Sequence, residues 1–307
     1  MMEYLPDFLI IGVQKAATSW LYYCLNEHPE IHLPAHKREV DFLGGEKFQK
    51  KGWEWWTSRF EGARASQIIG DVSVDYIYND EAPKLVKEKV GEVKLIVSLR
   101  DPIERAISAY YWNLRKGKIP NRSLNEGFRE VINTFKDSSQ TKVDEDAASL
   151  YQNIIQRGFY DSQIERYLNY FNLEDFLFLS FQKIKSKPLE QLQNLYRFLE
   201  VQADFKPDSL YRKPKRNSYL QTLITLERLG KHSKFVGKFA DILHNLASKI
   251  DIGNDRPKLH NDVRKGLSEI YKVHNANLLE ILNAYLENDS IKKNQSTDWD
   301  EVIGSWE

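Results

Sequence analysis

Four short apolar runs along the chain each predict a β-strand. They cover residues 8–13, 68–72, 93–99 and 176–181 and are rich in β-branched or aromatic side chains. Stretches with apolar residues at helical spacing alternate with these runs, as at 18–26 and 189–199. This alternation predicts an α/β fold: a three-layer sandwich whose central, mostly parallel sheet is flanked by helices.

The remaining parts of the chain lack further strand patterns. Residues 121–146 are polar and partly acidic, which predicts a surface excursion, and the chain is helix-rich from about residue 212. We find no internal repeat and no long linker. We therefore expect residues 1–307 to form a single domain.

Charge and cysteine content narrow the partners and the compartment. Lys and Arg together number 44, as do Asp and Glu, so there is no overall attraction to nucleic acid or to anionic membranes. One cysteine, Cys24, excludes a disulfide within the chain and a multi-thiolate metal site. The sequence also lacks a membrane-spanning apolar run and a secretion signal at its N-terminus. These features predict a cytoplasmic protein.

The first predicted strand ends in the sequence GVQKAATSWL, which combines a lysine and two hydroxyls at a strand-to-helix turn. Unpaired N–H groups and the helix dipole favour anions at such a turn, so Lys15, Thr18 and Ser19 predict a phosphate site, with Gly12 allowing a tight turn. An alternative is a capped helix whose hydroxyls only satisfy backbone amides. The loop lacks the second glycine and the Lys-Ser/Thr pair of nucleoside triphosphatases.

A second anion site is predicted where the strand at 93–99 ends. Arg100 follows this strand, Asp101 suits a helix N-cap, and Pro102 suits the first helical position. A guanidinium at a strand end can bind a phosphate through two parallel hydrogen bonds. Ser108, two helical turns later, and Arg105 are further candidates for binding the same phosphate. The alternative is a surface pair between Arg100 and Asp101.

Taken together, the two loops resemble the sulfotransferases that use 3′-phosphoadenosine 5′-phosphosulfate (PAPS). The first loop is similar to their GxxKxGTT loop, and the segment from Arg100 to Ser108 is similar to their R-[DN]-P-x-x-R-A-x-S motif. Further similarities are the G-x-Y sequence that ends at Tyr160, the helix at 188–199, and a C-terminal helix followed by Trp299. The resemblance implies the P-loop-like sulfotransferase fold, PAPS as donor, 3′,5′-adenosine diphosphate (PAP) as product, and no required metal.

The same resemblance implies a set of donor-binding residues. Lys15 also acts on the leaving oxygen, and the basic segment from Arg212 is similar to one that closes on the 3′-phosphate in bacterial relatives. The implied donor-binding residues are Gly12, Gln14, Lys15, Ala16, Ala17, Thr18, Ser19, Trp20, Arg100, Ser108, Tyr160, Arg212, Lys213, Arg216 and Asn217.

Two departures from the family pattern stand out. Ala17 replaces a frequent glycine, and Ser180-Phe181-Gln182-Lys183 replaces a frequent aromatic-Glu-Asp sequence. The first leaves the backbone donors of the loop in place. The second departure removes the Glu-Asp pair, so whatever this pair supports in the family is in doubt here. It therefore leaves open the alternative that the chain is a nucleotide-binding protein that has lost catalysis.

Sulfuryl transfer also needs a base to take the acceptor's proton. Glu39 lies in a segment similar to the family's K-E-x-x-F-F stretch and is the first candidate, while Asp71, in a segment similar to G-E-x-[ST]-P-x-Y, is the second. His32 and His36 are rivals, because a histidine base is common in the cytosolic branch of the family. The sequence does not choose among them.

The acceptor and the assembly state stay open. Small-molecule, lipid and saccharide acceptors, with O- or N-sulfation, all fit the sequence, and the C-terminal helices would suit a homodimer. A Mg²⁺-dependent nucleotide kinase or NTPase is the nearest rival, in which Asp71 would be the metal ligand.

Overall fold

The computed structural model describes residues 4–35, 42–136, 145–212, 219, 221–229, 242–243, 257–287 and 297–306. The chain divides into two compact units. The first comprises Met1–Asp101, Phe159–Arg212 and His274–Glu307, and the second comprises Pro102–Gly158 and Lys213–Val273. The expectation of a single domain stays a prediction.

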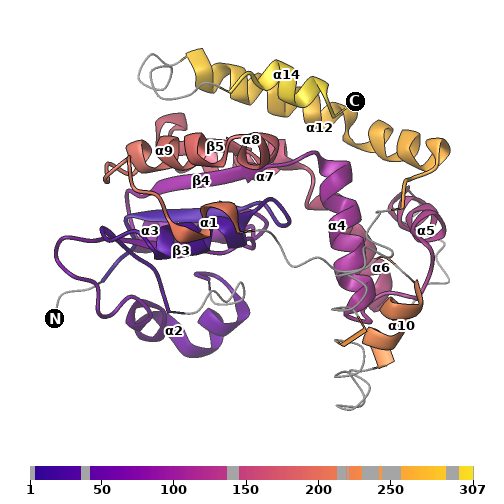
Figure 1. Cartoon of the computed structure of the whole chain (residues 1–307), viewed down its shortest axis with the longest axis horizontal. Helices are drawn as coiled ribbons and strands as arrows, with labels where there is room; N and C mark the ends of the chain where they lie inside the picture. The colour runs from indigo at the N-terminus through magenta and orange to yellow at the C-terminus, as the bar shows by residue number, and fades with distance from the viewer. Residues whose placement is uncertain are drawn as a thin grey trace. The chain divides into compact units, whose positions relative to one another are not determined.

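The first unit is built on a five-stranded sheet in the order β2-β3-β1-β4-β5, in which every neighbouring pair is parallel (Figure 1). The strands are β1 (Phe8–Gly12), β2 (Ile31–His32), β3 (Ile68–Val72), β4 (Lys94–Leu99) and β5 (Phe176–Ser180). Apart from β2, these are the four strands that the sequence predicts. The chain leaves β1 toward β3 on one side and later returns to place β4 on the other, so the switch point lies between β1 and β4.

Alternating side chains of the strands enter two hydrophobic cores, one on each face of the sheet. One core contains residues of α3 (Ala82–Lys89), α7 (Tyr160–Leu168) and α12 (Asn261–Glu287), with Trp56 of α2 (Glu46–Ser58). The other contains residues of α1 (Thr18–Asn26), α9 (Pro188–Phe198) and the 3-10 turn η2 (Asp208–Tyr211), and Ile184 of α8 (Phe181–Ser186). These layers form the predicted sandwich.

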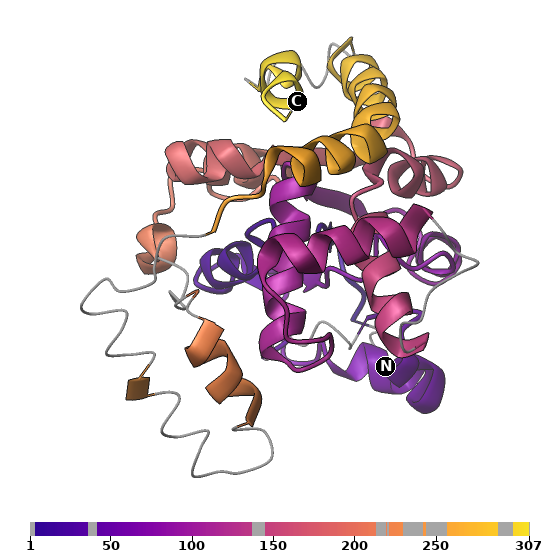
Figure 2. The same cartoon turned by 90° about the vertical axis from the view of Figure 1, so that its right-hand side faces the viewer.

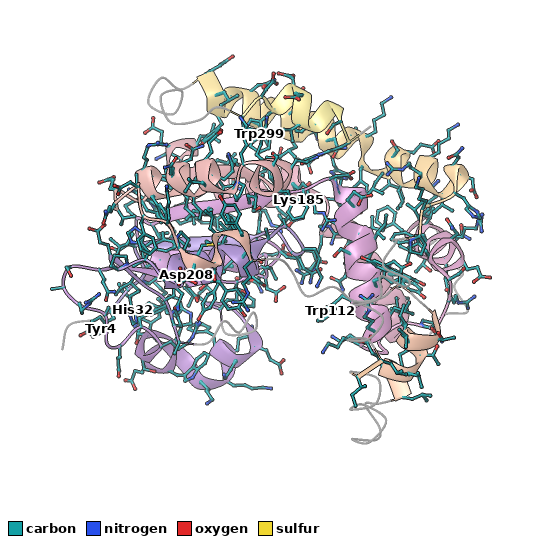
Figure 3. The ribbon with its side chains drawn as sticks, viewed as in Figure 1. Tyr4, His32, Trp112, Lys185, Asp208 and Trp299 are labelled. Carbon is teal, nitrogen blue, oxygen red and sulfur yellow. The ribbon has the colours of Figure 1, made fainter. Side chains whose placement is uncertain are left out.

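The last helix, α14 (Trp299–Gly304), completes the first of these cores. Trp299 is fully buried there and Trp306 is 2% exposed, and Trp299 is labelled in Figure 3. Burying two indoles contributes several kcal/mol, so this C-terminal segment stabilises the core next to α7.

The second unit is helical and contains α4 (Pro102–Arg115), α5 (Leu124–Lys136), α6 (Glu145–Gln156), α10 (Gln221–Leu229) and the start of α12. Figure 2 shows α4 and α5 in magenta and α10 in orange. As the sequence predicts, α4 begins at Pro102. Nowhere in the described residues does a helix combine the length and apolar character needed to cross a membrane.

One expectation was wrong in part: half of the segment 121–146 forms a packed helix and not a surface excursion. Leu124–Lys136 forms α5, which buries Leu124, Phe128 and Val131, while residues 137–144 lie outside the described part. Their spacing of four and three residues makes one apolar stripe on an otherwise polar helix. Gly127 packs under Tyr110 so closely that a Cβ there would lie 1.8 Å from the Tyr110 hydroxyl.

Candidate functional site

The loop after β1 is shaped to present backbone N–H groups. Lys15 and Ala17 have positive φ angles of 70° and 67°, while Ala16 between them does not. A turn that includes left-handed residues can bring backbone N–H groups together in a concave nest that binds anions. Within this loop the Ala16 N–H already donates to the Val13 carbonyl oxygen at 3.3 Å. Ala17 is also the N-cap of α1, and its methyl group offers no hydrogen-bond acceptor to the first turn.

Two side chains at the end of β4 hold the carbonyl groups of this loop. Arg100 donates from Nη1 to the Lys15 carbonyl oxygen at 2.8 Å, and the buried Ser98 donates from Oγ to the Ala16 carbonyl oxygen at 2.6 Å. Because the C=O and N–H of a trans peptide point in opposite directions, the N–H groups of Ala16 and Ala17 point away from these two side chains. The loop is therefore preorganised by the neighbouring strand.

Gly12 matters through close packing and not through a special backbone angle. A Cβ on Gly12 would lie 2.6 Å from Cγ2 of Ile77, and Gly12 is not among the residues with positive φ. The sequence predicts that Gly12 allows a tight turn, whereas the structure shows that glycine is needed because β1 lies very close to the segment after β3.

The first turn of α1 contributes the two predicted hydroxyls. Thr18 is 4% exposed, whereas Ser19 is exposed, so the two hydroxyls differ in access to solvent. Next to them, Trp20 donates from Nε1 to the carbonyl oxygen of Leu210 at 3.0 Å. This bond fixes the indole of Trp20 against η2.

Tyr160 supports Arg100, the residue predicted to bind the second anion. Its hydroxyl donates to the carbonyl oxygen of Arg100 at 2.9 Å, and its buried ring packs edge-on against Trp306 at 6.5 Å. Arg100 is therefore held at its carbonyl by α7 and bonded through its guanidinium to the loop after β1. The predicted site residues Lys15, Arg100 and Tyr160 form one connected group.

Asp71 lies at the end of β3 in a buried polar network. Its carboxylate accepts hydrogen bonds from Arg59 at 3.0 and 3.4 Å and from the Tyr76 hydroxyl at 2.8 Å, and its side chain is 3% exposed. Burial and the adjacent Asp71 charge raise the pKa of Tyr76 well above its usual range. These contacts hold both carboxylate oxygens of Asp71 in one orientation within the network.

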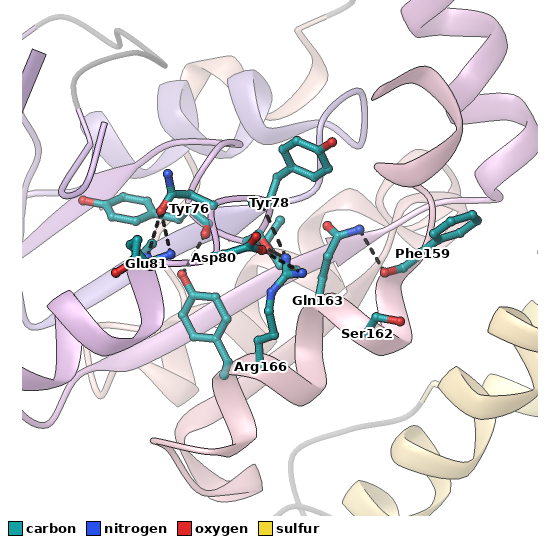
Figure 4. A network of polar contacts seen from close by, with 12 residues as sticks. Tyr76, Tyr78, Asp80, Glu81, Phe159, Ser162, Gln163 and Arg166 are labelled. Carbon is teal, nitrogen blue, oxygen red and sulfur yellow. Dashed lines mark hydrogen bonds and ion pairs between the residues drawn. The ribbon is translucent and has the colours of Figure 1, made fainter. Parts of the chain in front are cut away.

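The segment that follows β3 is held in turn by α7, as Figure 4 shows. Arg166 forms an ion pair with Asp80 at 2.9 Å and donates to the carbonyl oxygens of Ile77 and Tyr78. Tyr167 donates to the carbonyl oxygen of Tyr76 at 3.0 Å. Ile77, the neighbour of Gly12, is therefore held at its own carbonyl group and at the carbonyl groups of the residues before and after it.

The remaining predicted residues belong to the second unit, make other contacts or lie outside the described part. Ser108 belongs to α4 in the second unit, so its pairing with Arg100 on one phosphate stays a prediction. Arg105, in the same helix, is fully buried and donates to the carbonyl oxygen of Ile154 near the end of α6. Arg212 stacks on Tyr23 at 3.7 Å. Predicted residues outside the described part are His36, Glu39, Lys213, Arg216 and Asn217.

The rival base His32 ends β2, where the register pairs it with Ile69, two residues before Asp71. Burial lowers the pKa of His32, which favours its neutral form. Sequence reasoning missed Ser98, although a serine within the apolar strand KLIVSL is a visible signal. It also missed Phe181 as a contact of Arg100, for which the sequence offers no signal.

Comparisons with known proteins identify the family of this chain. The sequence profile described as "Sulfotransferase domain" matches residues 5–278. The chain is 31% identical over 288 residues to mouse bifunctional heparan sulfate N-deacetylase/N-sulfotransferase 4, covering 92% of this chain and 30% of that protein. It is 26% identical over 221 residues to mouse heparan sulfate glucosamine 3-O-sulfotransferase 5, covering 71% of this chain and 60% of that protein.

A solved structure shares the fold. The crystal structure of a sulfotransferase from Alicyclobacillus acidocaldarius superposes with a TM-score of 0.63 at 21% identity, covering 91% of this chain and 96% of that one. The chain spans under a third of the first relative and 60% of the second. Since the family profile matches most of its length, the chain belongs to the sulfotransferase family of enzymes.

Proposed function

We propose that this chain transfers a sulfuryl group from PAPS to a hydroxyl or amine of an acceptor and releases PAP. The observation that carries the proposal is the joining of the Lys15 loop to Arg100 at the switch point between β1 and β4. Two anion-binding groups on adjacent strand ends suit a nucleotide with phosphates on both its 5′ and 3′ oxygens.

The described residues fit the donor nucleotide. The nest of residues 15–17 and the N-terminus of α1 would hold the 5′-phosphosulfate, with Thr18 and Ser19 supplying hydroxyl donors. Arg100 would hold the 3′-phosphate, and Tyr160 would keep the Arg100 backbone in place. In this assignment each end of the nucleotide has its own cation.

The donor supplies an activated sulfuryl group, and the protein must stabilise the charge that develops as the group leaves. As the acceptor oxygen or nitrogen bonds to sulfur, the bond from sulfur to the phosphate oxygen breaks, and the ammonium of Lys15 would balance the charge on that oxygen. The acceptor's proton goes to a base. Glu39 remains the first candidate from the sequence, and Asp71 and His36 remain the alternatives.

The acceptor class is the least defined part of the proposal. Relatives are named as heparan sulfate N- and 3-O-sulfotransferases, so a saccharide with free amine and hydroxyl groups is the first acceptor to screen. Lipid and other small-molecule acceptors follow. Independence from metal, a cytoplasmic location and a homodimer are further expectations that accompany the proposal.

Thermal unfolding with added ligand tests the donor first, because a ligand that binds the folded state raises the unfolding midpoint. We expect PAP to raise the midpoint and ATP with Mg²⁺ not to do so, and we expect Lys15→Ala to abolish the rise. A rise only with ATP and Mg²⁺ would instead support a nucleotide kinase or NTPase.

Catalysis is tested separately with PAPS and the acceptor panel, with and without EDTA. Transfer that persists in EDTA supports the proposal. Glu39→Gln should remove most turnover while PAP binding is retained; full turnover in this variant would exclude Glu39 as the base. PAP binding without transfer to any acceptor would support a binding protein that has lost catalysis.

A further inference from the structure

The ends of β4 and β5 place Arg100 beside Phe181. The register pairs Leu99 with Ser180, the last residues of the two adjacent strands, and Arg100 and Phe181 directly follow them. The guanidinium carbon of Arg100 lies 4.4 Å from the centre of the Phe181 ring. A cation at this distance from an aromatic ring is attracted to it.

The ring of Phe181 is itself fixed by the local structure. Ser180 is fully buried, and its hydroxyl accepts from the N–H of Lys183 as the N-cap of α8. Phe181 is the first residue of this helix, so the cap determines where its side chain leaves the backbone. Lys185, labelled in Figure 3, places a second cation 5.8 Å from the same ring.

Stacking and hydrogen bonding use different parts of a guanidinium. The guanidinium carbon of Arg100 lies over the ring, while its N–H groups can donate, as Nη1 does to the Lys15 carbonyl oxygen. A guanidinium held in place in this way loses little further side-chain entropy when an anion binds, which raises affinity through preorganisation.

We propose that Phe181 is a positioning residue that holds Arg100 for the 3′-phosphate and so selects donors that carry this phosphate. The inference rests on the proposed function, because it concerns the nucleotide assigned to this site. It gives a role to the segment Ser180 to Lys183, where this chain departs from the family's usual sequence. The role predicts a change in selectivity between nucleotides, not only a change in stability.

The test compares the binding of PAP and of 5′-AMP, which lacks the 3′-phosphate, by calorimetry with the full chain. Phe181→Leu should weaken PAP binding by about three- to tenfold and change 5′-AMP binding by less than about twofold. Phe181→Tyr should restore most of the PAP affinity, because it keeps the aromatic face. Unfolding midpoints without ligand establish that each variant is folded.

The chain offers a matched control at the other end of β4. Lys94 begins this strand and lies 5.5 Å from the ring of Phe198, so Phe198→Leu removes a similar cation–aromatic pair. This variant should leave the ratio of PAP to 5′-AMP affinity unchanged.

Two different outcomes distinguish a failure of the proposed function from a failure of the role of Phe181. If the wild-type chain does not bind PAP, the proposed function is wrong and the inference is wrong with it. If the wild-type chain binds PAP but Phe181→Leu keeps the wild-type affinity ratio, or Phe198→Leu lowers it equally, only the inference is overturned.

Discussion

The guanidinium of Arg100 donates to the carbonyl oxygen of Lys15 at 2.8 Å, although the two residues are 85 positions apart in the sequence. The bond joins the two loops that the sequence identifies separately as anion sites. We expect Arg100→Lys to weaken PAP binding by about tenfold or more, because lysine keeps the charge but loses the planar fork of donors. Isothermal titration calorimetry measures this change directly.

The control for this variant is Lys94→Arg, which makes the reverse exchange at the start of the same strand. It should leave PAP affinity unchanged. Equal affinities for wild type and Arg100→Lys would show that Arg100 does not bind the 3′-phosphate through its fork.

Ala17 is strained in this loop, and glycine should relieve the strain. Its φ of 67° is unfavourable for any residue with a Cβ, and alanine is also a poor N-cap. We expect Ala17→Gly to raise the free energy of unfolding by about 1 kcal/mol, measured by urea denaturation. Ala16→Gly is the matched control and should lower it, since Ala16 is buried and lacks positive φ. A loss of stability in both variants would contradict the assigned strain.

The role of Asp71 can be separated from that of a base. Asp71→Asn should lower the free energy of unfolding by about 3 kcal/mol, because it leaves the largely buried Arg59 without its carboxylate partner. Asp80→Asn is the control: its partner Arg166 is also an arginine, but Asp80 is exposed, so the loss should stay below about 1 kcal/mol. Unchanged stability in Asp71→Asn together with lost turnover would return Asp71 to the role of a base.

We expect His32 to make the free energy of unfolding depend on pH. Burial lowers its pKa from the ordinary value of 6.5, and among the described residues its Nε2 has no hydrogen-bond partner. The imidazole of His32 is therefore protonated more readily in the unfolded chain than in the folded chain. As a result, the free energy of unfolding falls as pH drops through about 6.5. Urea denaturation at about pH 7.5 and about pH 5.5 should show a smaller loss in His32→Gln than in wild type.

The exposed His260 provides the comparison for this pH effect. His260→Gln should retain the wild-type loss of stability between the two pH values. If His32→Gln and wild type lose the same amount, His32 is not the source of the pH dependence.

Local features of this protein are legible in the sequence. The strands other than β2, the helix beginning at Pro102 and the two candidate anion loops follow from side-chain periodicity, capping residues and turn chemistry, which act over a few positions. The α5 helix shows the limit of such reasoning. Its buried stripe of Leu124, Phe128 and Val131 is diluted by polar neighbours, and only packing in the folded chain distinguishes it from a surface loop.

Strand order and register are decided by the tertiary structure. Placing β4 beside β1 brings Arg100 to Lys15, and pairing Leu99 with Ser180 brings Arg100 to Phe181. Likewise, the buried contacts of Asp71 with Arg59 and Tyr76 could not be anticipated from a strand-end carboxylate. The residues that carry the candidate chemistry can be read from the amino-acid sequence, because loop motifs are local. Which of them meet was decided by long-range packing of the sheet, since local periodicity does not specify contacts between distant segments.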